Sequence, residues 1–336
     1  MKKHPTRLLL VRIGLVLGSI FVSLLICELI LTVAGYRYTP LRIEVQKKSD
    51  WRDYHIFEDS SFVSDSDLIW RPKADSAVFN SQGYRGKELP ADKDRQSVRI
   101  FTIGDSNTLG WGQPNGPNWP LYLDELLRRV NDRVTVINAG VWGYSSFQGR
   151  RRFEETLQFN PDIVLISFGA NDAHRVTISD ADFANLGGRK LSFYLGQVTN
   201  KLRTGQLLLA ASDKVFRREP DQLIPRVSLD EYKANLNEII RVARSRNIQV
   251  VLLTRPYLGE SNNEGWWMTF APSYNDAVSQ VAQAADVPWI DIYSRFRNKA
   301  DSFIDESHFN EAGHRAMAEL VLERIKPIVN PLLAPK

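Results

Sequence analysis

Ser106 stands where a catalytic nucleophile is expected. It lies in residues 104–110 (GDSNTLG), directly after residues 98–103, which are mostly β-branched or aromatic and predict a strand. In an open parallel α/β sheet, ligands bind at the carboxyl ends of the strands, beside the N–H groups that begin the next helices. The pattern therefore predicts that Ser106 is a nucleophile. The alternative is a turn in which Asp105 or Ser106 caps the following helix.

A serine hydroxyl is a weak nucleophile at neutral pH, so it needs a neighbouring base, and that base needs a partner to orient it. Among five histidines, His308 is the best candidate, because Asp305 precedes it by three residues and can accept its Nδ1 proton within one turn. His174 is the competing candidate base and is otherwise expected to touch the substrate. For Asp305, the alternative is a cap on the helix that begins near residue 309.

Three further blocks of polar and glycine residues follow in order. They are residues 138–143 (NAGVWG), 169–172 (GAND) and 305–308 (DESH). Together with residues 104–110, these blocks resemble those of the SGNH (GDSL-type) hydrolase family, over roughly residues 98–325. The resemblance implies a serine esterase or acyltransferase on a flavodoxin-like three-layer α/β/α sandwich with a central parallel sheet, and it implies no cofactor and no particular substrate.

The resemblance also implies an oxyanion hole, formed by the N–H groups of Ser106 and Gly140 and the side-chain amide of Asn171. One good donor of this kind contributes roughly 3–4 kcal/mol to transition-state stabilisation. Glycine leaves room for an approaching carbonyl, and an amide donates without titrating. Asp105 and Asp172 are assigned mainly to shaping the loops. The residues expected to lie near the substrate are Asp105, Asn107, Trp142, His174, Trp266 and Trp267.

Other chemistries are less well supported. Asp172, Asp305 and His308 are side chains that bind metals, but neither His-x-x-x-His nor paired-cysteine spacing accompanies them, so no metal site is predicted. The net charge is +4, and four of the positive charges lie within the first twelve residues, which leaves the remainder formally neutral and argues against nucleic-acid binding. The single cysteine, Cys27, excludes an internal disulfide.

The N-terminal region predicts a membrane anchor. Residues 8–34 are apolar except for Arg12 and Glu28, and about 20 such residues cross a bilayer as a helix. The basic start of the chain favours a cytoplasmic N-terminus. Residues 1–35 are therefore predicted to be a single-pass signal-anchor, with the catalytic domain periplasmic or extracellular. The alternative is a cleaved signal peptide processed near residues 32–34.

The rest of the chain divides into a juxtamembrane segment and a catalytic domain. Residues 36–96 are polar with many aromatic anchors, and are expected to form short strands that pack on the domain. Residues 97–330 alternate strands with helices, which predicts a parallel sheet covered on both faces. Within them, residues 173–228 form a long insertion, interpreted as a helical lid or side lobe. The predicted strands are residues 99–103, 133–137, 163–168, 249–254 and 289–292, and the predicted helices are residues 119–130, 147–159, 229–246, 272–285 and 311–325.

These observations favour a membrane-anchored extracytoplasmic serine esterase. The expected substrate is an acyl group, in the first place O-acetyl, on a cell-envelope or secreted glycan, with small or lipid esters next. Transfer of the acyl group to a sugar hydroxyl instead of water would make the protein an O-acyltransferase, and the sequence leaves both outcomes open. The alternative from another class is a non-catalytic binding or assembly component of envelope polysaccharide machinery. The presence of all four blocks argues against it.

Overall fold

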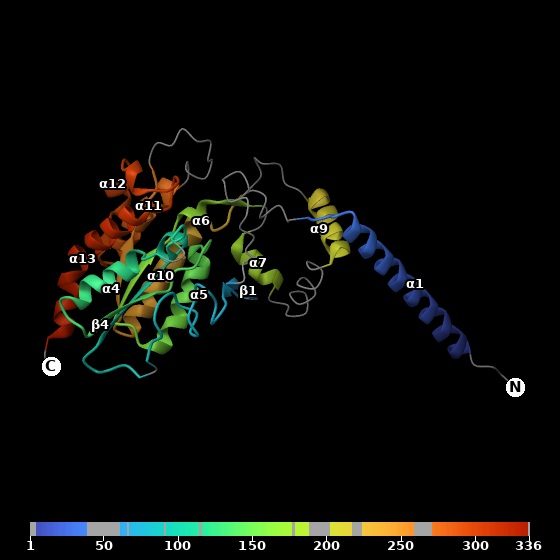
Figure 1. Ribbon diagram of the computed structural model, residues 1–336, viewed down its shortest axis with the longest axis horizontal. Coiled ribbons are helices and arrows are strands. Elements are labelled where there is room, and N and C mark those ends of the chain that lie inside the picture. The colour runs from blue at the N-terminus through green and yellow to red at the C-terminus, as the bar shows by residue number, and fades with distance from the viewer. Residues whose placement is uncertain are drawn as a thin grey trace.

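The computed structural model describes residues 5–38, 61–65, 67–90, 92–113, 116–176, 179–187, 202–216, 224–258 and 271–334. A five-stranded parallel sheet forms its centre (Figure 1). The strands are β3 (Val98–Gly104), β4 (Val134–Asn138), β5 (Ile163–Ser167), β8 (Gln249–Leu253) and β9 (Trp289–Ile290), in the spatial order β4-β3-β5-β8-β9. This is the flavodoxin-like order, whose direction reverses at β3. The predicted fold class is confirmed.

Each face of the sheet carries its own layer of helices. Helices α4 (Trp119–Arg128) and α13 (Glu311–Leu333) cover one face, and α5 (Ser146–Thr156), α10 (Leu229–Ser245) and α11 (Ala271–Ala284) cover the other. Successive strand residues point to opposite faces, so Ile100 packs under the first layer while Phe101 packs under the second. Burying one such side chain contributes roughly 1.5–3 kcal/mol to folding.

Helix α13 extends beyond the predicted end at residue 325. It continues to Leu333 with Pro327 and Pro331 inside it. A proline removes one backbone hydrogen bond from a helix, but Val329 is buried in the core and the carbonyl of Leu333 accepts a hydrogen bond from the Arg133 guanidinium at 3.0 Å. Tertiary packing therefore outweighs the local signal to stop.

The described part of the juxtamembrane segment packs on the domain beside the second block. Strand β1 (Phe62–Asp65) pairs antiparallel with β2 (Ile69–Pro72). Within β2, Nε1 of Trp70 donates to the carbonyl of Trp142 at 3.1 Å, and the hydroxyl of Tyr144 donates to the carbonyl of Trp70 at 2.8 Å. The aromatic residues of this segment thus support the loop after β4.

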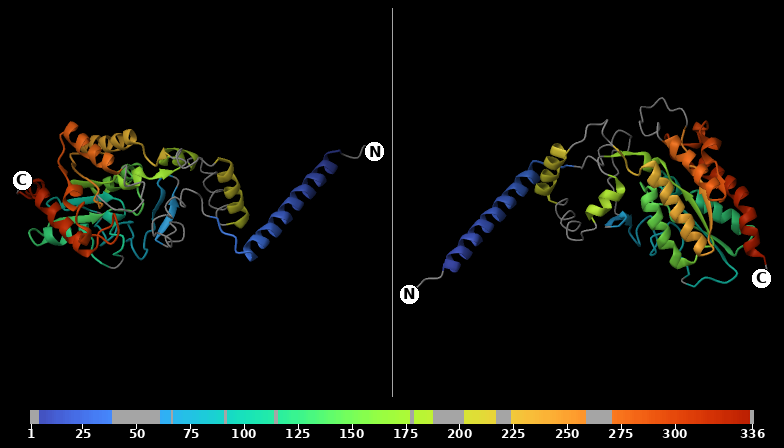
Figure 2. Two further views of the ribbon diagram at one scale, coloured as in Figure 1. Left: turned by 90° about the horizontal axis from the view of Figure 1, so that it is seen from above. Right: turned by 180° about the vertical axis from the view of Figure 1, so that it is seen from behind.

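The insertion is described in two parts. Near the domain, β6 (Arg175–Val176) pairs with β7 (Ile224–Pro225), and α7 (Asp180–Gly187) follows β6. Farther out, α9 (Arg203–Phe216) lies beside the N-terminal helix α1 (Pro5–Val33), as Figures 1 and 2 show. The lid prediction for residues 173–228 also covers residues outside the described ranges, and it stays a prediction.

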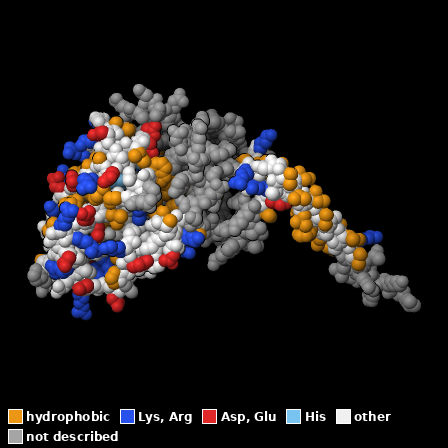
Figure 3. Space-filling view, viewed as in Figure 1, with side chains coloured by type: hydrophobic (Ala, Val, Ile, Leu, Met, Phe, Trp, Pro, Cys, Tyr) orange, Lys and Arg blue, Asp and Glu red, His pale blue; other side chains and the backbone are white. Residues whose placement is uncertain are grey.

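Helix α1 projects away from the domain. Its residues Val11–Val33 have a mean hydropathy of 2.5 and are long and apolar enough to cross a membrane. Apolar side chains cover its surface, whereas the domain surface mixes acidic and basic side chains (Figure 3). The helix has the length and composition of the predicted anchor, and a signal sequence can have the same length and composition.

Candidate active site

Ser106 begins the short helix α3 (Ser106–Leu109) at the carboxyl end of β3. Asp105 caps this helix, because its side chain accepts the N–H of Asn107 at 2.9 Å. The Ser106 hydroxyl oxygen lies 2.9 Å from Nε2 of His308, although 202 positions separate the two residues. Both side chains are almost fully buried. The structure therefore brings the predicted nucleophile and the predicted base into hydrogen-bond contact.

Asp305 completes the chain of contacts. Its carboxylate oxygens lie 2.7 and 3.0 Å from Nδ1 of His308, and Oδ1 also accepts the N–H groups of Ser307 and His308, each at 2.8 Å. Burial alone would raise the pKa of Asp305, but these hydrogen bonds and the adjacent imidazole outweigh it and lower the pKa. An ionised carboxylate fixes Nδ1 as the protonated nitrogen and leaves Nε2 free to face Ser106. The Trp111 ring packs on the imidazole, with 4.5 Å between ring centroids.

The two other described histidines lie in environments that disfavour the charged imidazole. Burial, reinforced by nearby cationic groups, lowers the pKa of both His174 and His314 to about 3. Nδ1 of His314 accepts the N–H of Trp119 at 3.3 Å, which is a packing role. The structure places His308, not His174, against the serine hydroxyl. A base role for His174 therefore has no support from the contacts of Ser106.

Gly140 supports the site in a way that the sequence does not reveal. A Cβ atom at this position would come within 2.4 Å of the Leu109 nitrogen and 2.9 Å of the Thr108 Cβ, so glycine is required for close packing against α3. Its N–H donates to Oδ1 of Asn138 at 2.9 Å. The expectation that glycine makes room for a substrate carbonyl stays a prediction, and the approach of two backbone segments is a further reason for glycine at this position.

Asn171 lies in the short helix α6 (Ala170–Ala173), after β5. Its side-chain Nδ2 donates one hydrogen bond to the carbonyl of Tyr144 at 3.0 Å. An asparagine amide carries two N–H donors, so this bond orients the group without using both. Asp172 behaves as the loop-shaping residue that was predicted, because it accepts the N–H groups of Ser146 at 2.8 Å and Gly169 at 3.1 Å.

Arg255 is the important residue that sequence reasoning missed. It follows β8, at the same edge of the sheet as Ser106. Its Nε donates to Oδ2 of Asp105 at 2.7 Å, and its Nη1 donates to the carbonyl of Ser307 at 2.7 Å. One buried guanidinium thus joins the residue before the nucleophile to the residue before the base. The available signal was an arginine placed directly after a buried strand.

Three of the residues expected near the substrate are as buried as Ser106. Asp105 is 1% exposed and Asn107 is 3% exposed, and Nδ2 of Asn107 donates to the carbonyl of Ser307 at 3.3 Å. Trp142 is also buried. These contacts give Asp105 and Asn107 a role in positioning the loops, and the prediction that Asp105, Asn107 and Trp142 lie near the substrate stays a prediction. Trp266 and Trp267 lie outside the described residues, and their assignment stays a prediction.

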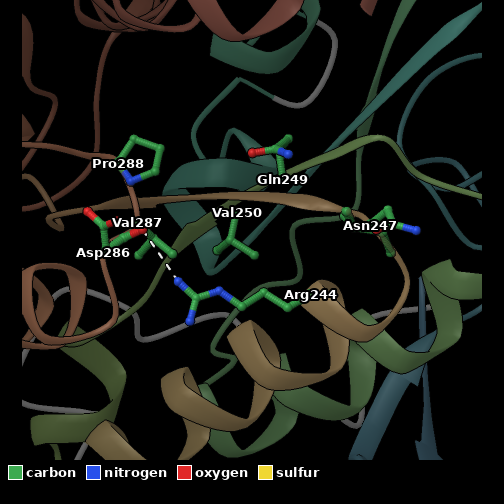
Figure 4. Close-up of a pocket in the computed structure, with 8 residues that line it drawn as sticks. Arg244, Asn247, Gln249, Val250, Asp286, Val287 and Pro288 are labelled. Carbon is green, nitrogen blue, oxygen red and sulfur yellow. Dashed lines mark hydrogen bonds between the residues drawn. The ribbon is translucent and has the colours of Figure 1, made fainter.

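Neither a metal site nor a second reactive centre emerges from the described ranges. Within them, three or more His, Cys, Asp or Glu side chains nowhere gather into a group that could hold a metal ion. A pocket with a volume of about 260 Å³ is lined by residues that include Arg244, Gln249 and Pro288, which Figure 4 labels. Gln249 begins β8 and Pro288 precedes β9, so this pocket lies at the amino ends of the strands, opposite Ser106.

Residues 102–316 match the family model of the GDSL-like Lipase/Acylhydrolase family. The match covers 215 of the 336 residues and includes Ser106, Gly140, Asn171 and His308. The chain belongs to this family, which confirms the resemblance seen in the sequence. Membership places it in the class of ester hydrolases.

Individual relatives are more distant. An arylesterase of Vibrio mimicus is 38% identical over 80 residues, 24% of this chain but only 40% of that enzyme. The uncharacterized lipoprotein YqeF of Bacillus subtilis (strain 168) is 23% identical over 217 residues, 59% of this chain and 71% of that protein. A lipase/acylhydrolase structure from Enterococcus faecalis has a TM-score of 0.48 and 23% identity, over 69% of this chain and 96% of that chain. An acetylxylan esterase structure, Axe2 from Geobacillus stearothermophilus, has a TM-score of 0.47 and 20% identity, over 69% and 97%.

Proposed function

We propose that this protein is a serine esterase that acts outside the cytoplasm. The observation that carries the proposal is the continuous contact from the Ser106 hydroxyl through the His308 imidazole to the Asp305 carboxylate, at 2.9 and 2.7 Å. A base within hydrogen-bond reach, oriented by an ionised carboxylate, is the arrangement that activates a serine.

The reaction would proceed in two halves. Ser106 Oγ attacks the ester carbonyl carbon while His308 Nε2 takes its proton, and the imidazolium then gives that proton to the leaving alkoxide. In the second half, His308 takes a proton from a water that attacks the acyl carbon, and the imidazolium returns this proton to Ser106 Oγ as the bond between the acyl carbon and Oγ breaks and the acid leaves. Asp305 stays ionised throughout, because its role is to stabilise the imidazolium.

The negative carbonyl oxygen would be held by three donors. The Ser106 N–H begins α3 and has no acceptor in the preceding turn of that helix, and the second amide N–H of Asn171 is the next donor. The Gly140 N–H would be shared with Asn138 Oδ1, which already accepts it at 2.9 Å. Sharing makes Gly140 the weakest of the three donors.

The proposed substrate is an O-acetylated glycan of the cell envelope or a secreted one. Support comes from α1, since a membrane anchor with a basic cytoplasmic start holds the catalytic domain on the far side of the membrane. The matched region of the Vibrio mimicus arylesterase makes aryl acetates the natural probe for a first assay.

The test is intact-mass spectrometry of the full-length protein in detergent after treatment with a fluorophosphonate. We expect one adduct, on Ser106, which disappears in Ser106→Ala and forms slowly in His308→Ala. Ser245→Ala is the matched control, because Ser245 is exposed at the end of α10. An adduct that persists in Ser106→Ala would overturn the nucleophile assignment. Acetate release from acetylated xylo-oligosaccharide, with and without an added sugar acceptor, then separates hydrolysis from acyl transfer.

A further inference from the structure

An acid within the apolar helix α1 has a specific partner. The Glu28 carboxylate accepts the N–H groups of Arg203 and Thr204, each at 2.8 Å, and the hydroxyl of Thr204 at 2.9 Å. These groups begin α9, so Glu28 caps a helix that lies about 175 positions away in the sequence. A carboxylate in this position satisfies free backbone donors and complements the helix dipole.

A second contact fixes α9 just after α1 ends. The N–H of Tyr38 donates to the side-chain oxygen of Gln206 at 3.1 Å. Figure 2 (left) shows the two helices meeting near the C-terminal end of α1 and diverging from there. Glu28 is five residues before Val33, which is about 7.5 Å along the helix axis. The start of α9 is therefore held at the level of the last turns of α1.

The surface of α9 is apolar at this level. Eight large apolar side chains are exposed in the described residues outside α1, and three of them lie in or next to α9: Leu202 directly before it, and Leu207 and Leu208 in its N-terminal half. Leu208 is 66% exposed. Residues 201–218 also carry five Lys or Arg against one Asp. Exposed leucines on a helix within a segment that is rich in basic residues are typical of a membrane–water interface.

We propose that α9 lies in the headgroup region of the leaflet where α1 ends, with Leu208 inserted among the lipid acyl chains. The proposal rests on the membrane anchor in the proposed function. A span of about 30 Å needs about 20 residues, so a span that starts at Val11 reaches its far boundary close to Glu28. The apolar surface of α9 is then continuous with that of α1, and lipid is its occupant. In this arrangement α9 docks the enzyme on the membrane.

The experiment uses the full-length protein in vesicles of phosphatidylethanolamine and phosphatidylglycerol. In a Cys27→Ser background, a nitroxide is attached to Leu208→Cys, and its collisions with oxygen and with a water-soluble nickel chelate are measured. Val130→Cys is the matched control, because Val130 is also apolar and 69% exposed but lies on the catalytic domain. We expect an oxygen-to-nickel ratio at least about threefold higher at position 208 than at position 130, since oxygen partitions into lipid.

Three outcomes would overturn the proposal, each in a distinct way. A ratio at position 208 equal to that at position 130, with the protein resistant to alkaline carbonate, would place α9 in water while leaving the anchor intact. Protection from both reagents would mean that protein, either a partner or a second copy, covers Leu208. Extraction of the protein by carbonate would show that α1 does not anchor it in the membrane. Ester hydrolysis can be measured on every sample and reports separately on the proposed activity.

A second variant tests the connection to α1. Glu28→Leu keeps α1 apolar but removes the cap, and we expect the ratio at position 208 to fall toward that at position 130 while membrane insertion and hydrolysis of a soluble ester persist. Glu28→Gln keeps one acceptor oxygen and should retain most of the difference. An unchanged ratio in Glu28→Leu would contradict the role of Glu28.

Discussion

Two buried Arg–Asp pairs hold the two sides of the candidate site. Arg255 and Asp105 meet at 2.7 Å, and Arg226 and Asp180 meet at 2.9 Å, with all four side chains at most 2% exposed. The first pair joins the loops that carry Ser106 and His308. The second joins the insertion to the loop after β4, because Arg226 also donates to the carbonyl of Gly143 at 2.7 Å. The same chemistry therefore links the loops of Ser106 and His308 on one side and supports the loop after β4 on the other.

The difference lies in what else each guanidinium touches. Arg255 reaches the carbonyl of Ser307, next to His308, whereas Arg226 reaches Gln148 and contacts the face of the Trp70 ring. Breaking a buried ion pair typically costs 3–5 kcal/mol, because one charge remains without its partner. Both pairs should thus matter for stability, but only the first should matter strongly for the proposed reaction.

The largest effect on kcat is expected at Asp305, which lies in the same loop as His308. Asp305→Asn keeps the size of the side chain but removes the negative charge that orients His308. We expect kcat for p-nitrophenyl acetate to fall by about 10³–10⁴-fold, with little change in the thermal unfolding midpoint. A decrease of less than about tenfold would make Asp305 a residue that only shapes its loop, through the N–H groups of Ser307 and His308, and not part of the proposed triad.

The two pairs can be compared directly with Arg255→Met and Arg226→Met. Each should lower the free energy of unfolding by about 3–5 kcal/mol, measured by urea denaturation. Arg255→Met should also lower kcat by about 10–100-fold at a temperature where the variant is fully folded, since the Ser106–His308 geometry loosens. Equal effects of the two variants on kcat would contradict the prediction that only the Arg255 pair matters strongly for the reaction. Arg255→Lys provides a milder control, because lysine keeps the charge but not the fork geometry.

Gly140 follows β4 and packs closely against α3, so a substitution there tests the packing around Ser106. Gly140→Ala adds a methyl group against the Leu109 nitrogen and Thr108, so α3 must shift. We expect a loss of about 1–3 kcal/mol in the free energy of unfolding, typical of overpacking, with a lower rate of acylation by the fluorophosphonate. An unaltered acylation rate would show that α3 can move without disturbing Ser106.

The smallest expected effect concerns pH. His314, whose pKa is also lowered by the charges of Arg85 and Arg255, binds protons only in the unfolded state between about pH 3 and 6.5. Stability should therefore fall on acidification, by about 2 kcal/mol between pH 7 and 5, and His314→Asn should remove that dependence. Urea denaturation at the two pH values measures this difference.

The region around Arg226 should contribute less to the pH dependence of stability. The lowered pKa of His174 makes stability fall on acidification, as for His314. Burial, however, raises the pKa of the neighbouring Asp172 to about 7. A raised carboxyl pKa contributes stability at low pH that is lost as the pH rises through 7, so Asp172 offsets His174 over this range. Replacing His174 with Asn should then leave stability nearly equal at pH 5 and pH 7, because Asp172 now offsets His314. A fall in stability instead would contradict the offset.

Local sequence determined the elements and the order of the chemistry. Buried β-branched runs gave strands within one or two residues of their predicted ends, and amphipathic periodicity did the same for α4, α10 and α11. These signals are short-range, because strand and helix patterns repeat every two or 3.6 residues. Ser106 was identifiable for the same reason, as a serine between glycines after a strand.

Tertiary structure decided which distant groups meet. Asp105 and Arg255 are 150 positions apart, and Glu28 and Arg203 are 175 apart, so no local pattern pairs them. The continuation of α13 past Pro327 depends on the burial of Val329 in a core built from other segments. Burial makes each buried charge costly unless a partner is present, and only the folded chain brings that partner within reach.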